Sequence, residues 1–136
     1  MRNLAPFAVA AAAVLTVAAP GRAQTHASPP APYQAVSALV DLPDFIPGMG
    51  SLYVDPATLP AGPFLAYDRE GRLVSSVYMI PLAGMNGHQN FEGLAVGGGE
   101  VDHVDIQYNA GHPGVAEPHY HVTLWYVSPQ EAAGLQ

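Results

Sequence analysis

Four residues in the last third of the chain have types and a spacing that could bind a metal ion. One residue separates His103 from Asp105, and one separates His119 from His121. Successive strand side chains point to opposite faces, so each pair projects from one face with its Cα atoms about 6 to 7 Å apart. Two imidazoles at that separation can reach one ion at about 2.0 to 2.1 Å. If the two segments pair as a hairpin, the sequence predicts a metal site of His103, Asp105, His119 and His121.

These ligand types limit the metal but leave other interpretations open. Two or three histidines with one carboxylate suit zinc, copper or iron, and the set does not choose among them. The chain has no cysteine, so thiolate ligands and cysteine nucleophiles are excluded. A polar face of an antiparallel sheet is also typical of a solvated surface or a subunit contact without any cofactor. A metal-bound water would be a possible nucleophile, but no catalytic residue is assigned.

The two segments that carry these residues alternate as strands do. Residues 101–108 and 118–127 each place apolar and polar side chains on opposite faces. We expect the apolar face to join the core, and the histidine face to lie opposite it. That face also carries Trp125, which could line an apolar pocket or fill a subunit interface. We expect the interface because large aromatic residues are enriched there. His112, at the tip of the connecting loop, could close over the site or be solvated. The apolar positions are Val104, Ile106, Tyr108, Tyr120, Val122, Leu124 and Tyr126.

The rest of the domain reads as short strands and turns. Residues 64–67 and 73–80 flank Asp68-Arg69-Glu70-Gly71, which predicts a hairpin with Gly71 in the left-handed conformation. Residues 36–42 suggest a first strand. Ser128, Pro129 and Glu131 form a capping-box pattern that predicts a short C-terminal helix. The fold expected for residues 36–136 is a single, mainly β domain, an antiparallel sheet or small open barrel with that helix.

The first 35 residues are expected to form an export signal and a tether rather than part of the fold. Arg2 precedes a small and apolar run from Leu4 to Ala19, and small residues lead to Ala23. This pattern is typical of a signal peptide over residues 1–23, and the run is too short for a spanning helix. Residues 24–35 form a proline-rich flexible tether. We expect a secreted or periplasmic protein, cleaved near Ala23.

Net charge argues against several partners. After cleavage, Arg69 and Arg72 would remain against eleven acidic residues, a formal charge of about −9. Such a surface repels phosphate backbones and anionic headgroups, so we expect no nucleic-acid partner and no membrane contact after cleavage. The same acidic surface attracts cations. Without disulfides, a small exported domain also commonly relies on a bound metal or on homo-oligomerisation.

Several short motifs together resemble one known group of proteins. They are Pro47-Gly48-Met49-Gly50, Val54-Asp55-Pro56, the segment 101–109, Gly111-His112-Pro113 and Pro118-His119-Tyr120-His121. This pattern, spread over roughly residues 43–132, resembles a family of small exported bacterial proteins of unknown function. Its characterised relative is controlled by an extracytoplasmic sigma factor and its anti-sigma factor. The resemblance implies an antiparallel, β-rich homo-oligomer, with no established reaction.

The chain departs from that family's pattern at two histidines. The family's Met-Gly turn is followed by a histidine, and its last strand carries His-x-Asp-x-His. Here Leu52 stands at the first position, and the strand reads His119, His121 and Thr123. If the family's histidines bind metal, this chain has lost that site or rebuilt it around His103, His119 and His121.

Three functions therefore remain open. The first is a binding module that holds a metal ion or a small polar ligand on the histidine face. The second is a stress-related envelope protein whose homo-oligomeric assembly is its function, without metal. The third is a metal-dependent enzyme that uses the same cluster.

Overall fold

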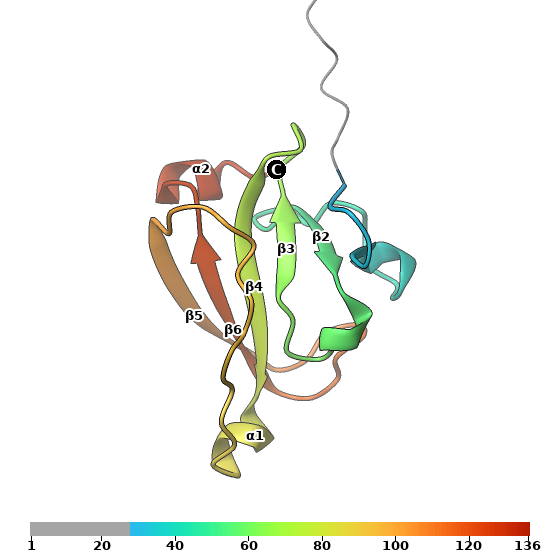
Figure 1. Cartoon of the computed structure of the whole chain (residues 1–136), viewed down its shortest axis with the longest axis vertical. Coiled ribbons are helices and arrows are strands. Elements are labelled where there is room, and N and C mark those ends of the chain that lie inside the picture. Colours follow the sequence, from blue (N-terminus) through green and yellow to red (C-terminus); the bar gives the residue numbers. More distant parts are fainter. Residues whose placement is uncertain (1–27) are drawn as a thin grey trace, which may run out of the picture.

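One antiparallel sheet organises the described part of the chain, residues 28–136 of a computed structural model (Figure 1). Its six strands are hydrogen-bonded in the order β1-β2-β3-β4-β6-β5, and every neighbouring pair is antiparallel. The strands are β1 Gln34–Ala35, β2 Ser51–Val54, β3 Phe64–Tyr67, β4 Leu73–Pro81, β5 His103–Asn109 and β6 His119–Trp125. The predicted mainly β, antiparallel fold is confirmed, as an open sheet.

Four short helices connect or flank the strands in the part of the chain that the structure describes. They are η1 Val36–Ala38, η2 Pro56–Thr58, α1 Leu82–Asn86 and α2 Pro129–Ala133. The predicted C-terminal helix is α2, and its capping box is complete: the Ser128 hydroxyl accepts from the Glu131 N–H, and the Glu131 carboxylate accepts from the Ser128 N–H. Within residues 28–136, no helix is long and apolar enough to cross a membrane.

The N-terminal predictions fall largely outside the described residues. The signal peptide proposed for residues 1–23 lies wholly outside them, and so does the start of the tether at 24–35. The last two residues of that tether, Gln34 and Ala35, pair with β2 as the edge strand β1. The strand suggested for residues 36–42 was wrong, because this stretch begins with the 3₁₀ helix η1.

The β3–β4 hairpin forms where the sequence predicts it, and Asp68 holds its turn. Gly71 has a φ of 79°, which suits the absence of a side chain. Asp68 is 7% exposed, and its carboxylate accepts from the backbone N–H groups of Glu70 (3.1 Å) and Arg72 (2.8 Å). It also accepts from Nε of Arg72 at 3.0 Å. One side chain therefore satisfies three hydrogen-bond donors of this turn.

Replacing Asp68 with alanine should destabilise the protein measurably. The substitution leaves two backbone N–H groups and Nε of Arg72 without their acceptor, so we expect the free energy of unfolding to fall by about 1.5 kcal/mol. Urea denaturation followed by circular dichroism measures this. Glu70→Ala, in the same turn but exposed, is the matched control and should change stability by less than about 0.5 kcal/mol. Equal losses in both variants would contradict the role given to Asp68.

The faces of the β5–β6 hairpin are the reverse of those predicted. The histidine face is buried on β6, where His119, Thr123 and Trp125 are 1%, 6% and 7% exposed. The apolar side chains of β5 are instead at the surface: Val104, Ile106 and Tyr108 are 51%, 67% and 57% exposed. Trp125, expected at a subunit interface, is in the core. Strand side chains alternate between the two faces of a sheet. An error about which face is covered therefore reverses the predicted burial of every side chain in the hairpin.

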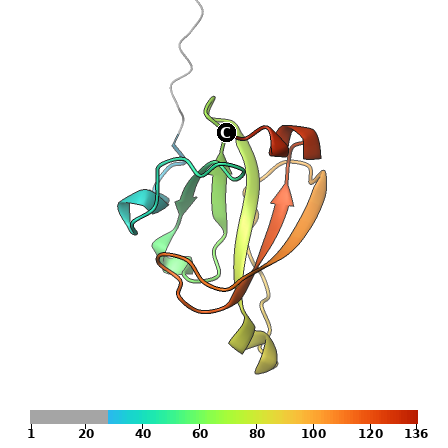
Figure 2. The same cartoon turned by 180° about the vertical axis from the view of Figure 1, so that it is seen from behind.

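Segments distant in the chain decide which face is covered. Residues 36–49 and the β5–β6 loop lie on the same side of the sheet (Figure 2). Their apolar side chains meet those of β2, β3 and β4 there. A second core cluster joins α2 to Trp125, and Leu52 packs against both clusters. On the other side, the segment between α1 and β5 runs along β4, where Ser76 Oγ accepts from the Gly97 N–H at 2.9 Å. This segment leaves the β5 side chains uncovered.

Candidate metal centre

Three histidine rings converge at the end of β6 nearest the loop. Nε2 of His119 lies 3.0 Å from Nε2 of His121 and 3.2 Å from Nε2 of His112. The nitrogen atoms of all three residues that could serve as ligands lie within 4.8 Å of one another. His119 is the central and most buried member. These residues are therefore close enough to hold one metal ion.

Backbone carbonyls fix the ring nitrogens of two of these histidines. Nδ1 of His119 lies 2.7 Å from the Glu117 carbonyl oxygen, and Nδ1 of His112 lies 2.9 Å from the Pro113 carbonyl oxygen. A carbonyl oxygen only accepts, so Nδ1 carries the hydrogen in each neutral ring and Nε2 carries a lone pair. Metal-ligating histidines are held in this way, with the second ring nitrogen donating to a carbonyl or carboxylate.

The third ring, His121, is held in its neutral form. Burial, and then the neighbouring His119 and His112 rings, lower the pKa of His121 from 6.5 to about 4. Deprotonated imidazole is the form that binds metal. At neutral pH this ligand therefore has no proton to lose before an ion binds.

Two glycines let the β5–β6 loop carry His112 back toward the strand. At Gly111 (φ 129°) an added Cβ would lie 2.5 Å from the Ala116 carbonyl oxygen, and at Gly114 (φ 87°) it would lie 2.8 Å from the Val40 side chain. Neither position has room for another residue without movement. Between them, His112 and Val115 exchange two backbone hydrogen bonds of 2.9 Å. The loop is thus a tight turn that points His112 at the β6 histidines.

Of the four predicted ligands, the structure brings together two. His119 and His121 are in the cluster, while His103 and Asp105 lie further along the hairpin. Gln107 is the residue paired with His121, so His103 is four residues away, about 13 Å along the strand. His103 and Asp105 have other partners around the indole of Trp125.

The second group is a structural contact around that indole. The Trp125 Nε1–H donates to the Asp105 carboxylate at 2.9 Å. The His103 ring stacks on Trp125 with 5.9 Å between ring centroids, and its Nδ1 lies 2.8 Å from the Asp102 carboxylate. Asp105 therefore satisfies a buried indole N–H. His112, which the sequence placed at the tip of a loop that could close over the site, is the third member of the cluster.

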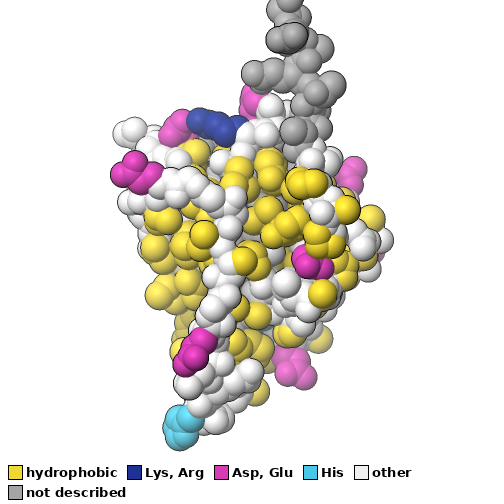
Figure 3. Space-filling model, in the orientation of Figure 1, with side chains coloured by type: hydrophobic (Ala, Val, Ile, Leu, Met, Phe, Trp, Pro, Cys, Tyr) yellow, Lys and Arg dark blue, Asp and Glu magenta, His cyan; other side chains and the backbone are white. Residues whose placement is uncertain are grey.

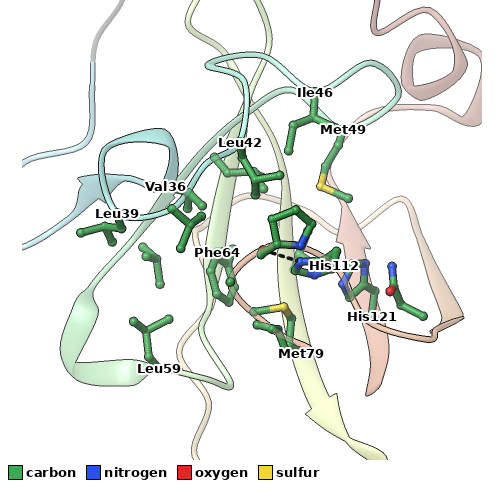
Figure 4. Close-up of a pocket in the computed structure, with 18 residues that line it drawn as sticks. Val36, Leu39, Leu42, Ile46, Met49, Leu59, Phe64, Met79, His112 and His121 are labelled. Atoms are coloured by element: carbon green, nitrogen blue, oxygen red, sulfur yellow. Dashed lines mark hydrogen bonds between the residues drawn. The ribbon is translucent and has the colours of Figure 1, made fainter. Parts of the chain in front are cut away.

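An apolar cavity of about 290 Å³ adjoins the histidines, and His112 and His121 are part of its wall (Figure 4). His119 faces a second hollow, of about 370 Å³, whose lining includes Pro60, Pro81 and Glu117. Members of the cluster therefore border both hollows.

Comparison with known proteins finds similarity to a solved structure. No family model matches the chain, and no curated protein does. Among solved structures, the chain is similar to the crystal structure of a hypothetical protein, TTHB210, from Thermus thermophilus. The two share 47% sequence identity over 69% of this chain and 92% of that one, with a TM-score of 0.63. This chain belongs to the same family as the Thermus protein.

This family membership supports the fold but supplies no activity. The Thermus relative is itself called a hypothetical protein, so no reaction or ligand comes from it. The link to an extracytoplasmic sigma factor stays a prediction, and so does export. The function has to be inferred from the site.

Proposed function

We propose that this protein binds one divalent transition metal ion through Nε2 of His112, His119 and His121. One observation carries the proposal: two of these rings are fixed by carbonyls so that their Nε2 lone pairs face each other at 3.2 Å. Two lone pairs at that distance repel unless a cation lies between them. A metal ion would supply that cation, and a shared proton is the simplest alternative.

Distances between the nitrogen atoms support a metal over a proton. Three ligands at about 2.0 to 2.1 Å from a tetrahedral ion lie about 3.3 Å apart. The two separations at His119, 3.0 and 3.2 Å, are close to this value, and the nitrogens of His112 and His121 lie within 4.8 Å of each other. A single proton could join only one pair of rings, whereas three rings converge here. An ion would use all three ligands and keep a fourth position open.

The ligand set favours zinc or copper(II). Imidazole suits zinc, copper and iron, but the common non-haem iron site adds a carboxylate to two histidines. Within the described residues, the cluster contains histidines alone. Three histidines with an open fourth position is an arrangement known for catalytic zinc. The acidic surface would also raise the local concentration of cations.

Elemental mass spectrometry on protein purified without an affinity tag tests this proposal. We expect about one zinc or copper ion per chain, or one equivalent taken up with sub-micromolar affinity by protein first treated with a chelator. Isothermal titration calorimetry with zinc and with copper gives the affinity and the stoichiometry. Protein that holds no metal and takes up neither zinc nor copper would overturn the proposal.

A metal-dependent enzyme is a second candidate, and the adjoining cavity is what favours it. A three-histidine site with an open position can bind a water molecule and lower its pKa toward neutrality. Hydrolysis assays on the zinc-loaded protein, with a chelator-treated sample beside it, would test this. Turnover lost with the metal and regained on adding it would support an enzyme.

We also propose that the uncovered face of β5 mediates homo-oligomer assembly. Val104, Ile106 and Tyr108 form an exposed apolar row there, and hydrophobic side chains gather on the side of the molecule where β5 lies (Figure 3). Contiguous apolar surface of this kind is typical of protein interfaces. As an edge strand of the sheet, β5 also has backbone groups free to pair.

Ile106→Asp is expected to disrupt that assembly. A carboxylate at the centre of an apolar contact would have to lose its water, so the variant should run as a monomer in size-exclusion chromatography with light scattering. Met85→Asp, at a position 49% exposed on α1, is the matched control and should leave the assembly intact. A monomeric wild type, or an oligomeric Ile106→Asp variant, would contradict the assignment of this face.

A further inference from the structure

The cavity beside the histidines is large and almost wholly apolar. It holds about 290 Å³, roughly twice the volume of an engineered apolar cavity of about 150 Å³ that binds benzene. By that ratio it has room for about twelve carbon atoms. Apolar side chains from residues 36–49, the strands β2 to β4 and the loop form most of the wall: Val36, Leu39, Leu42, Leu52, Phe64 and Met79 among them.

Polar groups are confined to one end of this cavity. Asn109, His112 and His121 are the polar side chains in its lining. Figure 4 shows the two histidines on the side of the chamber opposite Leu39 and Leu59. Those two leucines are 41% and 48% exposed, so they lie at the rim. A ligand that fills the chamber would have an apolar body and one polar head at the histidine end.

Charge identifies the head group. Three neutral imidazoles leave both positive charges of a divalent ion uncompensated, and the lining contains no aspartate or glutamate. An uncompensated charge in an apolar environment is costly. A bound anion would remove that cost, and carboxylate oxygens are established ligands for zinc at about 2.0 to 2.2 Å.

We propose that the cavity binds a small monocarboxylate with an apolar body, of the size of a medium-chain fatty acid. Its carboxylate occupies the open coordination position of the metal, and its chain lies against Phe64 and Met79. This inference rests on the proposed metal site. It replaces the small polar ligand expected from the sequence, because the chamber offers a polar ligand few partners.

The methionines provide a test in the unmodified protein. Met49 and Met79 line the cavity, whereas Met85 is on α1 and 49% exposed. In zinc-loaded protein labelled with ¹³C at the methionine methyl groups, sodium octanoate should shift the Met49 and Met79 signals and leave Met85 in place. Octanol has the same chain without the charge, so it should bind about 10- to 100-fold more weakly. Removing zinc should weaken octanoate binding to a similar extent.

The outcomes separate this inference from the metal site itself. Zinc that binds while octanoate leaves Met49 and Met79 unmoved would overturn the ligand proposal and leave the metal proposal standing. Equal affinity for octanol and octanoate, or for octanoate with and without zinc, would overturn the role given to the carboxylate. Failure to bind zinc in the preceding titration would overturn the metal site, and this inference with it.

Discussion

Replacing His119 with alanine is expected to lower the affinity for zinc or copper by about 100-fold or more. Changes to the supporting partners of a ligating histidine already cost about 10- to 100-fold, and loss of the ligand itself should cost at least as much. His119 is also the ring from which both short nitrogen–nitrogen separations are measured. Its removal leaves only His112 and His121.

The sharpest control is another histidine from the same hairpin. His103→Ala removes an imidazole that lies on the same face of the sheet but contacts Trp125 rather than the cluster. This variant should therefore keep the wild-type metal content. Since His119 is 1% exposed, its variant could lose stability, and His112→Ala on the loop provides a second test. The metal content should fall in His119→Ala and in His112→Ala, and it should remain at the wild-type level in His103→Ala. Loss of metal in His103→Ala and His119→Ala with retention in His112→Ala would restore the site expected from the sequence, and retention in both cluster variants would contradict the proposed site.

The local structure of this protein could be predicted because the signals for it are local. The β3–β4 hairpin follows from two apolar runs around a four-residue turn ending in Gly71. The α2 helix follows from Ser128 and Glu131, which satisfy each other's backbone groups within one turn. His119 and His121 share a direction because strand side chains alternate. Each of these inferences depends on residues a few positions apart.

The covered face of the sheet could not be predicted in the same way. Alternation shows that β5 and β6 each have two faces, but both faces carry large apolar groups, Ile106 on one and Trp125 on the other. Burial was decided by residues 36–49 and by α2, which are distant in the sequence. Without their positions, the more continuous apolar row of β5 was the natural but incorrect choice of core.

Local sequence patterns also failed to predict which residues form the site. His103 and Asp105 repeat the spacing of His119 and His121, yet the hairpin register places them beside Trp125. His112 has no such spacing, because a tight loop brings it to the cluster rather than a strand. Gly111 and Gly114 on either side of it were the available signal, since glycines at such positions indicate a turn with a fixed path.

Acid should destabilise the metal-free protein through His121. An unfolded chain takes up this proton near the ordinary pKa of 6.5, whereas burial and then the neighbouring imidazoles hold the folded pKa at about 4. Between these values the unfolded state binds more protons, so the free energy of unfolding falls as pH falls from 6.5 and levels off below about 4. We expect a loss of about 2 kcal/mol from this group, less than the full shift implies because the ring is only partly buried. Urea titrations with a chelator present, at pH values from 7.5 to 4, should show a shallower decline for His121→Gln. Wild-type and variant curves that fall in parallel would refute the assignment.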